Sequence, residues 1–163
     1  MSFTLTFVII TESPAFTATP VSFTRRLYST YVSYLPAEAF AYGLQRREDP
    51  RGVLAEFLKS PSLGQIFVSR TRPGITRGNH YHDAKTEKFL VLEGDAVIAF
   101  RHRVTGETAR VPVAGTELRV VDIPPGWAHA ITNVGDRELI VLFWASEVFD
   151  PARPDTHPGE VGP

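Results

Sequence analysis

The segment Gly74–Gly94 constrains this chain more than any other. It contains His80 and His82, and side chains two residues apart on a β-strand point to the same face. Four residues separate His82 from Glu87, which opens an apolar stretch typical of a second strand. Together with His129 from a later segment, these residues make a normal ligand set for a divalent ion. Zinc is the first candidate, and iron, nickel and manganese are the others.

The sequence between residues 64 and 145 predicts an all-β fold. Short stretches of alternating apolar and polar residues are separated by turns rich in glycine, proline and aspartate, which is typical of a sandwich or barrel. Gly94 and Asp95 are expected to form a tight hairpin, and residues 117–122 a strand. No glycine-rich G-x-G-x-x-G motif follows a strand, so we expect no dinucleotide-binding half and no nicotinamide cofactor.

The two ends of the chain differ in sequence pattern from residues 64–145. Residues 1–24 are expected to form an N-terminal arm or strand, and the apolar run 5–10 lacks the preceding basic residues of a signal peptide. Residues 27–34 are a β-prone aromatic cluster, and Pro36 introduces a short helical turn. The proline-rich tail is expected to lie as an extended strap over the barrel, and residues 157–163 are its C-terminal end.

Length and charge narrow the functional classes. A chain of 163 residues is expected to form one domain, which we place at residues 25–156. The net charge of −1 gives no electrostatic reason to bind nucleic acid or an anionic membrane. There is no cysteine, which excludes disulfides and thiolate ligands and agrees with a cytoplasmic location.

Two motifs resemble those of the cupin superfamily. The spacing G-x5-H-x-H-x4-E-x6-G resembles the first cupin motif, and P-x-G-x2-H-x3-N resembles the end of the second. The second motif is filled by Pro124, Gly126, His129 and Asn133, although its leading glycine is not at the expected distance. The resemblance implies a double-stranded β-helix, a jelly-roll barrel, whose metal ligands are His80, His82, Glu87 and His129.

The likeness extends over roughly residues 27–156. The segments LYSTYVSYLP, DPRG and FWASEVFDPARPDT, with both motifs, resemble the C-terminal cupin domain of bifunctional capsular-polysaccharide UDP-sugar enzymes of the CapF type. In that family a reductase domain precedes a metal-bearing domain that epimerises a UDP-linked 4-keto-6-deoxy amino sugar at C3. The resemblance covers the metal-bearing domain and not the reductase domain, so it implies the epimerase half and leaves a separate reductase as a candidate partner.

The residues suit this chemistry. A metal ion near the C4 carbonyl oxygen would stabilise the enolate that forms when the C3 proton leaves. Lys85 and Tyr81 are the first candidates for proton transfer, with Lys88 and His102 as further ones.

A third motif, D-x-R-G-x-L-x-E, resembles a segment of cupin-fold enzymes that act on nucleotide-linked keto-sugars. It places Arg51 and Glu56 at the nucleotide end, where Arg51 could pair with a diphosphate. Arg77 is a further substrate-binding candidate. A homodimer is expected, because pairing between N-terminal strands would cover exposed sheet edges.

Two other classes of function stay open. One is a metal cupin that catalyses a different reaction, such as a dioxygenase or keto-isomerase. The other is a cupin that binds a sugar without turnover.

Overall fold

The computed structural model describes residues 23–162. Among them, residues 45–162 belong to one compact unit and residues 23–44 to a second. The strand expected within residues 1–24 lies outside the described residues. The domain boundaries expected from the sequence stay predictions.

The smaller unit contains a helix where the sequence suggested extended structure. Helix α1 (Phe23–Ser33) includes most of the β-prone aromatic cluster, so that expectation is wrong. Phe23, Leu27 and Tyr31 recur every four residues, which is a helical period, and this period outweighs the β propensity of the individual residues. The short helical turn after Pro36 is confirmed as the 3-10 helix η1 (Ala37–Ala39).

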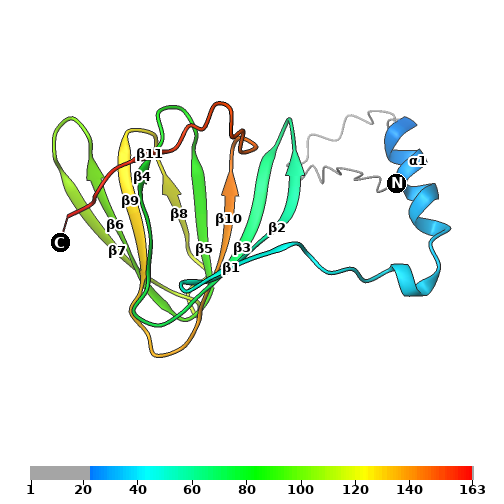
Figure 1. Cartoon of the computed structure of the whole chain (residues 1–163), viewed down its shortest axis with the longest axis horizontal. Coiled ribbons are helices and arrows are strands. Elements are labelled where there is room, and N and C mark those ends of the chain that lie inside the picture. The colour runs from blue at the N-terminus through cyan, green and yellow to red at the C-terminus, as the bar shows by residue number, and fades with distance from the viewer. Residues whose placement is uncertain (1–22, 163) are drawn as a thin grey trace. The chain divides into compact units, whose positions relative to one another are not determined.

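The larger unit is built from two antiparallel sheets (Figure 1). One sheet has the order β1 (Arg46–Asp49), β2 (Gly52–Ser60), β3 (Gly64–Thr71), β10 (Leu139–Ala145), β5 (Glu87–Glu93) and β8 (Val120–Ile123). The other has the order β11 (His157–Pro158), β4 (Thr76–Tyr81), β9 (Trp127–Asn133), β6 (Asp95–His102) and β7 (Thr108–Ala114). The all-β jelly-roll expectation is confirmed.

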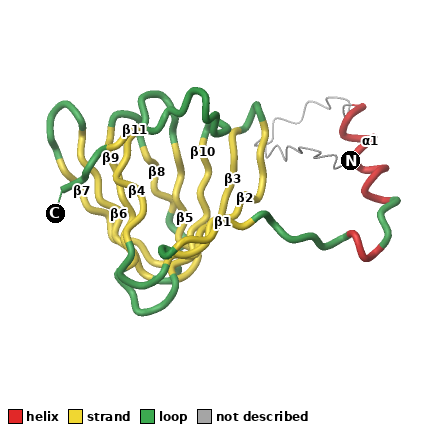
Figure 2. The backbone as a smooth tube through the Cα atoms, viewed as in Figure 1, coloured by secondary structure: helices red, strands yellow, loops and turns green. Residues whose placement is uncertain are grey.

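The chain passes repeatedly from one sheet to the other, and this corrects one predicted connection. β5 pairs with β10 and β8, whereas β6 pairs with β9 and β7, so Gly94 and Asp95 do not close a hairpin. They carry the chain between the sheets, with Gly94 at a φ of 88°. A local turn signal cannot report which strands become neighbours. The turn near Gly106 does connect paired strands, β6 and β7, and Figure 2 shows it as a loop joining them.

The hydrophobic core fills the space between the sheets. Alternate residues of β10 are buried, as expected for a strand with one face inward. Ile98, Leu139 and Val141 are completely buried, and each such side chain contributes roughly 1.5–3 kcal/mol of transfer free energy. Phe143 stacks on Phe67, with ring centroids 4.9 Å apart, at the part of the core that faces the functional site.

The C-terminal segment forms the expected extended strap. Its last strand, β11, pairs with the edge of β4, with His157 opposite Tyr81 and Pro158 opposite His80. No helix among residues 23–162 is long and apolar enough to cross a membrane.

Candidate metal centre

The four predicted ligands come together inside the barrel. The ligand atoms of His80, His82, Glu87 and His129 all lie within 4.8 Å of one another. The side chains of His82 and His129 are each about 1% exposed, and that of Glu87 is 8% exposed. The donor set is compact, and three of its members are buried while His80 is half-buried, so these are not surface histidines.

Strand register and one bulge produce this convergence. His80 on β4 lies opposite His129 on β9, after a register shift between Gly78 and His80. Within the shift, Asn79 adopts a φ of 57°. At Gly78 a Cβ atom would lie 2.7 Å from the carbonyl oxygen of His129, so a side chain would push the two strands apart. Glu87 comes from β5 in the other sheet, so the ligands span both sheets.

The hydrogen bonds of the imidazoles suit a metal ion. His82 Nδ1 lies 2.5 Å from the carbonyl oxygen of Asp155, and His129 Nδ1 lies 3.2 Å from that of Trp127. Because a carbonyl only accepts, each Nδ1 carries a proton, and each Nε2 faces the cluster. Both buried Nε2 atoms lack a hydrogen bond of acceptable geometry, although Glu87 Oε2 lies 3.3 and 3.4 Å away.

Electrostatics keep the ligands in their metal-binding forms. Burial lowers the pKa of His80 to about 4, with a further lowering from neighbouring His129, so His80 is neutral at pH 7. For Glu87, burial alone would raise the pKa, but interactions with His129 and His82 outweigh it and hold the pKa well below its usual range. His80 and Glu87 therefore take the neutral and the ionised form, respectively, in which imidazole and carboxylate groups bind zinc and related ions.

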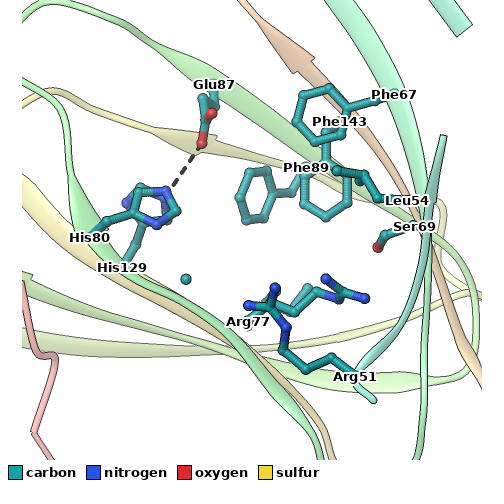
Figure 3. A pocket seen from close by; sticks show the side chains of 12 residues that line it. Arg51, Leu54, Phe67, Ser69, Arg77, His80, Glu87, Phe89, His129 and Phe143 are labelled. Atoms are coloured by element: carbon teal, nitrogen blue, oxygen red, sulfur yellow. Dashed lines mark ion pairs between the residues drawn. The ribbon is translucent and has the colours of Figure 1, made fainter. Parts of the chain in front are cut away.

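A cavity of about 220 Å³ adjoins the cluster (Figure 3). His80, Glu87 and His129 line one side of it, and an aromatic wall of Phe67, Phe89 and Phe143 lies beside them. The two arginines, Arg51 and Arg77, lie away from the imidazoles. The cavity therefore combines a metal-ligand end, an apolar wall and a cationic end.

The cationic end has unused hydrogen-bonding capacity. Arg77 Nε donates to Thr71 Oγ1 at 2.9 Å, but its buried Nη2 has no hydrogen-bond partner in the part of the chain that the structure describes. Ser69, which is 1% exposed, also has an unpartnered hydroxyl and lines the same cavity. Arg51 is held by Asp49, whose carboxylate accepts from its Nε at 3.0 Å and from its Nη2 at 2.6 Å. An oxyanion would satisfy these donors.

A wider cavity of about 720 Å³ also adjoins the cluster. Glu56 and Lys85 line it together with His80, His82 and Glu87. Lys85 is 7% exposed, and its Nζ lies 3.1 Å from Thr156 Oγ1 and 4.0 Å from Glu87 Oε1. The structure thus brings Lys85 to the metal ligands. Glu56 lines this wider cavity, whereas Arg51 and Arg77 line the smaller one.

Other candidates for proton transfer lie elsewhere. The ring of Tyr81 stacks on His157 at 5.1 Å between centroids, and the guanidinium of Arg103 lies 3.8 Å above it. Exposed Lys88 forms an ion pair with Asp122. The backbone N–H of Thr105 donates a hydrogen bond to His102 Nδ1 at 3.1 Å. None of Tyr81, Lys88 and His102 lines either of the two cavities beside the cluster.

The sequence patterns do not identify two residues that line or support the site, Ser69 and Asp155. Ser69 could have been noticed because it shares one face of β3 with Phe67 and Thr71 by the two-residue period. Asp155 gave no local signal, because its contacts with His82 and the following loop join residues more than 70 positions apart.

Three histidines and a glutamate converge between the two sheets of a jelly-roll barrel. This arrangement defines a class of proteins, the cupins that carry a set of potential metal ligands. The model of the family described as "Polysaccharide biosynthesis C-terminal domain" matches residues 47–157. The chain belongs to this family, as a C-terminal cupin domain of the CapF type.

Two similar proteins are longer than this chain. It is 47% identical over 139 residues to the UDP-2-acetamido-2,6-beta-L-arabino-hexul-4-ose reductase of Pseudomonas aeruginosa, covering 85% of the chain and 37% of the reductase. It is 50% identical to the solved structure of capsular polysaccharide assembling protein CapF from Staphylococcus aureus, with a TM-score of 0.80, over 83% of the chain and 39% of CapF. The chain therefore spans under two fifths of either protein.

A more distant structure shares the fold. ChmJ from Streptomyces bikiniensis, a 3'-monoepimerase solved as a double mutant with dTDP, matches with 17% identity and a TM-score of 0.53, over 71% of the chain and 65% of ChmJ. At this identity the match supports the barrel architecture alone.

Proposed function

We propose that this domain epimerises a UDP-linked 2-acetamido-4-keto-6-deoxy sugar at C3, with zinc as the first candidate metal. The observation that carries the proposal is the pairing of a buried His3Glu cluster with a cavity that ends in two arginines. Support for a keto-sugar nucleotide comes from the related reductase, whose name describes a UDP-linked hexul-4-ose. Polysaccharide biosynthesis is the corresponding process.

His80, His82, Glu87 and His129 would hold the metal. A divalent ion there supplies positive charge for the negative charge that develops on the sugar carbonyl oxygen when the neighbouring C–H proton leaves. Lys85 is proposed as the group that takes this proton, because its Nζ lies beside Glu87 and lines the wider cavity. Tyr81 is the weaker candidate, because its ring packs on His157 and Arg103.

The cationic end of the smaller cavity is proposed to bind the diphosphate. Arg77 Nη2 and Ser69 Oγ are buried donors without a partner, and Arg51 lines the same cavity. A guanidinium can donate two parallel hydrogen bonds to phosphate oxygens. Glu56, on the wider cavity, is proposed to accept a hydrogen bond from the base, so the nucleotide would pass beside Leu54 and Phe67, which line both cavities.

The reaction defines the partners of the domain. Epimerisation through an enolate is redox-neutral, so it needs no nicotinamide. A reductase that consumes the epimerised ketone, in the same polypeptide or as a separate protein, is the proposed partner. We further propose that the protein works as a cytoplasmic homodimer, which equilibrium sedimentation would test.

Deuterium exchange tests the reaction directly. In D2O, the protein loaded with zinc should exchange deuterium into C3 of the UDP-linked 4-keto sugar. Removing the metal should slow exchange on the order of 100- to 1000-fold, the usual loss when one stabilising group is removed. Lys85→Met should slow exchange while zinc content stays at one ion per chain, whereas Lys88→Met is the matched control on the exposed ion pair with Asp122.

Each negative result of these exchange experiments would refute a different part of the proposal. Absence of C3 exchange with any UDP- or dTDP-linked 4-keto sugar would refute the epimerase. Oxygen uptake with bound iron would then point to an oxygenase. Exchange that survives complete metal removal would preserve the activity but discard the role of the His3Glu cluster.

A further inference from the structure

The segment Asp155–Gly159 holds the loop that carries the metal ligands. The carboxylate of Asp155 accepts hydrogen bonds from three successive backbone N–H groups, those of Asp83, Ala84 and Lys85, at 2.7, 2.9 and 2.7 Å. These residues connect β4 to β5, between His82 and Glu87.

Residues 156–159 make further contacts on both sides of the loop. The backbone N–H of Gly159 donates to Asn79 O at 2.9 Å. A Cβ atom at Gly159 would lie 2.9 Å from the ring of Tyr81, so the close approach requires glycine. On the inner side, Thr156 Oγ1 accepts from Lys85 Nζ at 3.1 Å. Residues 155–159 thus follow the ligand-bearing segment from Asn79 to Lys85.

The contact with His82 has a direct chemical consequence. Asp155 O lies 2.5 Å from His82 Nδ1, which fixes the proton on Nδ1 and turns Nε2 toward the other ligands. His129 is oriented differently, because its Nδ1 bonds to Trp127 O, two residues away on the same strand. The orientation of His129 is therefore local to β9, whereas that of His82 depends on a segment 73 residues later in the chain.

We propose that Asp155–Gly159 is a positioning clamp for the metal centre. When the clamp is seated, it fixes the tautomer and direction of His82 and holds Lys85 in the wall of the wider cavity. When it is released, the barrel core persists, because no residue after Ala145 belongs to the buried core within residues 23–162. The inference rests on the proposed metal centre and does not depend on the sugar reaction. Asp155 and Gly159 are its positioning residues.

Two full-length variants test the clamp. Asp155→Ala removes the acceptor for the three N–H groups, and Gly159→Val forces a side chain against Tyr81. Asp150→Ala is the matched control, because Asp150 lies in the same strap and, among residues 23–162, its side chain bonds within residues 150–153. Zinc affinity, measured by competition with a chelating indicator, should fall about 10- to 100-fold in both test variants, as for other residues that orient metal ligands, and should stay unchanged in the control.

A second readout needs no metal. In the metal-free protein, long-range 1H–15N spectra should show His82 protonated at Nδ1 in the wild type and in Asp150→Ala. In Asp155→Ala and Gly159→Val, protonation at Nε2 should appear. A Co2+ absorption spectrum that changes in the same two variants would report the altered ligand orientation.

The outcomes separate the clamp from the proposed function. Zinc affinity within twofold of wild type in both test variants, with His82 still protonated at Nδ1, would overturn the clamp. An equal loss in Asp150→Ala would overturn it as well, because any disturbance of the strap would then suffice. If the wild type does not bind zinc, the tautomer of His82 alone decides. Expected zinc and tautomer results with no C3 exchange would support the clamp and refute the epimerase.

Discussion

Replacing Arg77 should weaken nucleotide binding while leaving the fold nearly intact. Arg77 points its unpartnered Nη2 into the smaller cavity, and its Nε is already used by Thr71. Hydrogen bonds to charged groups contribute about 1.5–3 kcal/mol. Arg77→Met should therefore raise the dissociation constant for UDP by about 10- to 150-fold. Arg77→Lys should have an intermediate effect, since lysine keeps the charge but not the planar fork.

Ligand-free stability should respond only weakly. Losing the bond to Thr71 costs about 1 kcal/mol. This loss is opposed because burial, and then the nearby charge of Arg51, lower the pKa of Arg77 and so disfavour its cationic form in the folded protein. A net change of up to 1 kcal/mol corresponds to a shift in melting temperature of about 2–4 °C for a domain of this size.

Isothermal titration calorimetry with UDP measures the affinity, and calorimetric unfolding measures the stability. Arg70→Met is the matched control, because Arg70 lies on neighbouring β3 but forms an exposed ion pair with Glu138 at 2.5 Å. UDP affinity that is unchanged in Arg77→Met would refute the placement of the diphosphate. An equal loss in Arg70→Met would show that general positive charge, not the cavity, governs binding.

Three further predictions concern the metal ligands and the core. Glu87→Gln should lower zinc content and abolish most of the zinc-induced rise in melting temperature, since a ligand bound only by the folded state stabilises it by mass action; full zinc occupancy would exclude Glu87 as a ligand. In the metal-free protein, the free energy of unfolding should fall as pH decreases from about 6.5 to 4, because the unfolded state protonates at position 80 before the folded state, and urea titrations of His80→Asn should show a smaller slope. Ile98→Ala should cost about 2–5 kcal/mol by urea unfolding, whereas Val104→Ala on the exposed β6–β7 turn should cost almost nothing; equal costs would contradict the assigned core.

The sequence predicted what depends on short-range periodicity. The two-residue period places His80 and His82 on one face, and turn residues mark most strand ends. The confirmed jelly-roll class follows from these patterns and from the motif resemblance. Helix α1 departs from the expected extended structure because the four-residue spacing of Phe23, Leu27 and Tyr31 outweighs the β propensity of the individual residues.

Long-range arrangement could not be foreseen in this way. The crossing at Gly94 depends on which strands become neighbours, and that is decided by the packing of two sheets. The role of Asp155 depends on the strap reaching a loop 70–72 residues earlier. Neither property leaves a pattern within a window of ten or fifteen residues.

The origin of the ligands in both sheets gives the metal centre a mechanical role. His80 and His129 belong to β4 and β9, and Glu87 belongs to β5 across the barrel. An ion held by all three would cross-link the two layers beside the cavity, where apolar contacts between them are interrupted. In a chain without cysteine, such a cross-link would take the place of an inter-sheet disulfide. Metal loading should therefore slow the separation of the layers, and amide exchange in β4 and β5 should accelerate together after chelation.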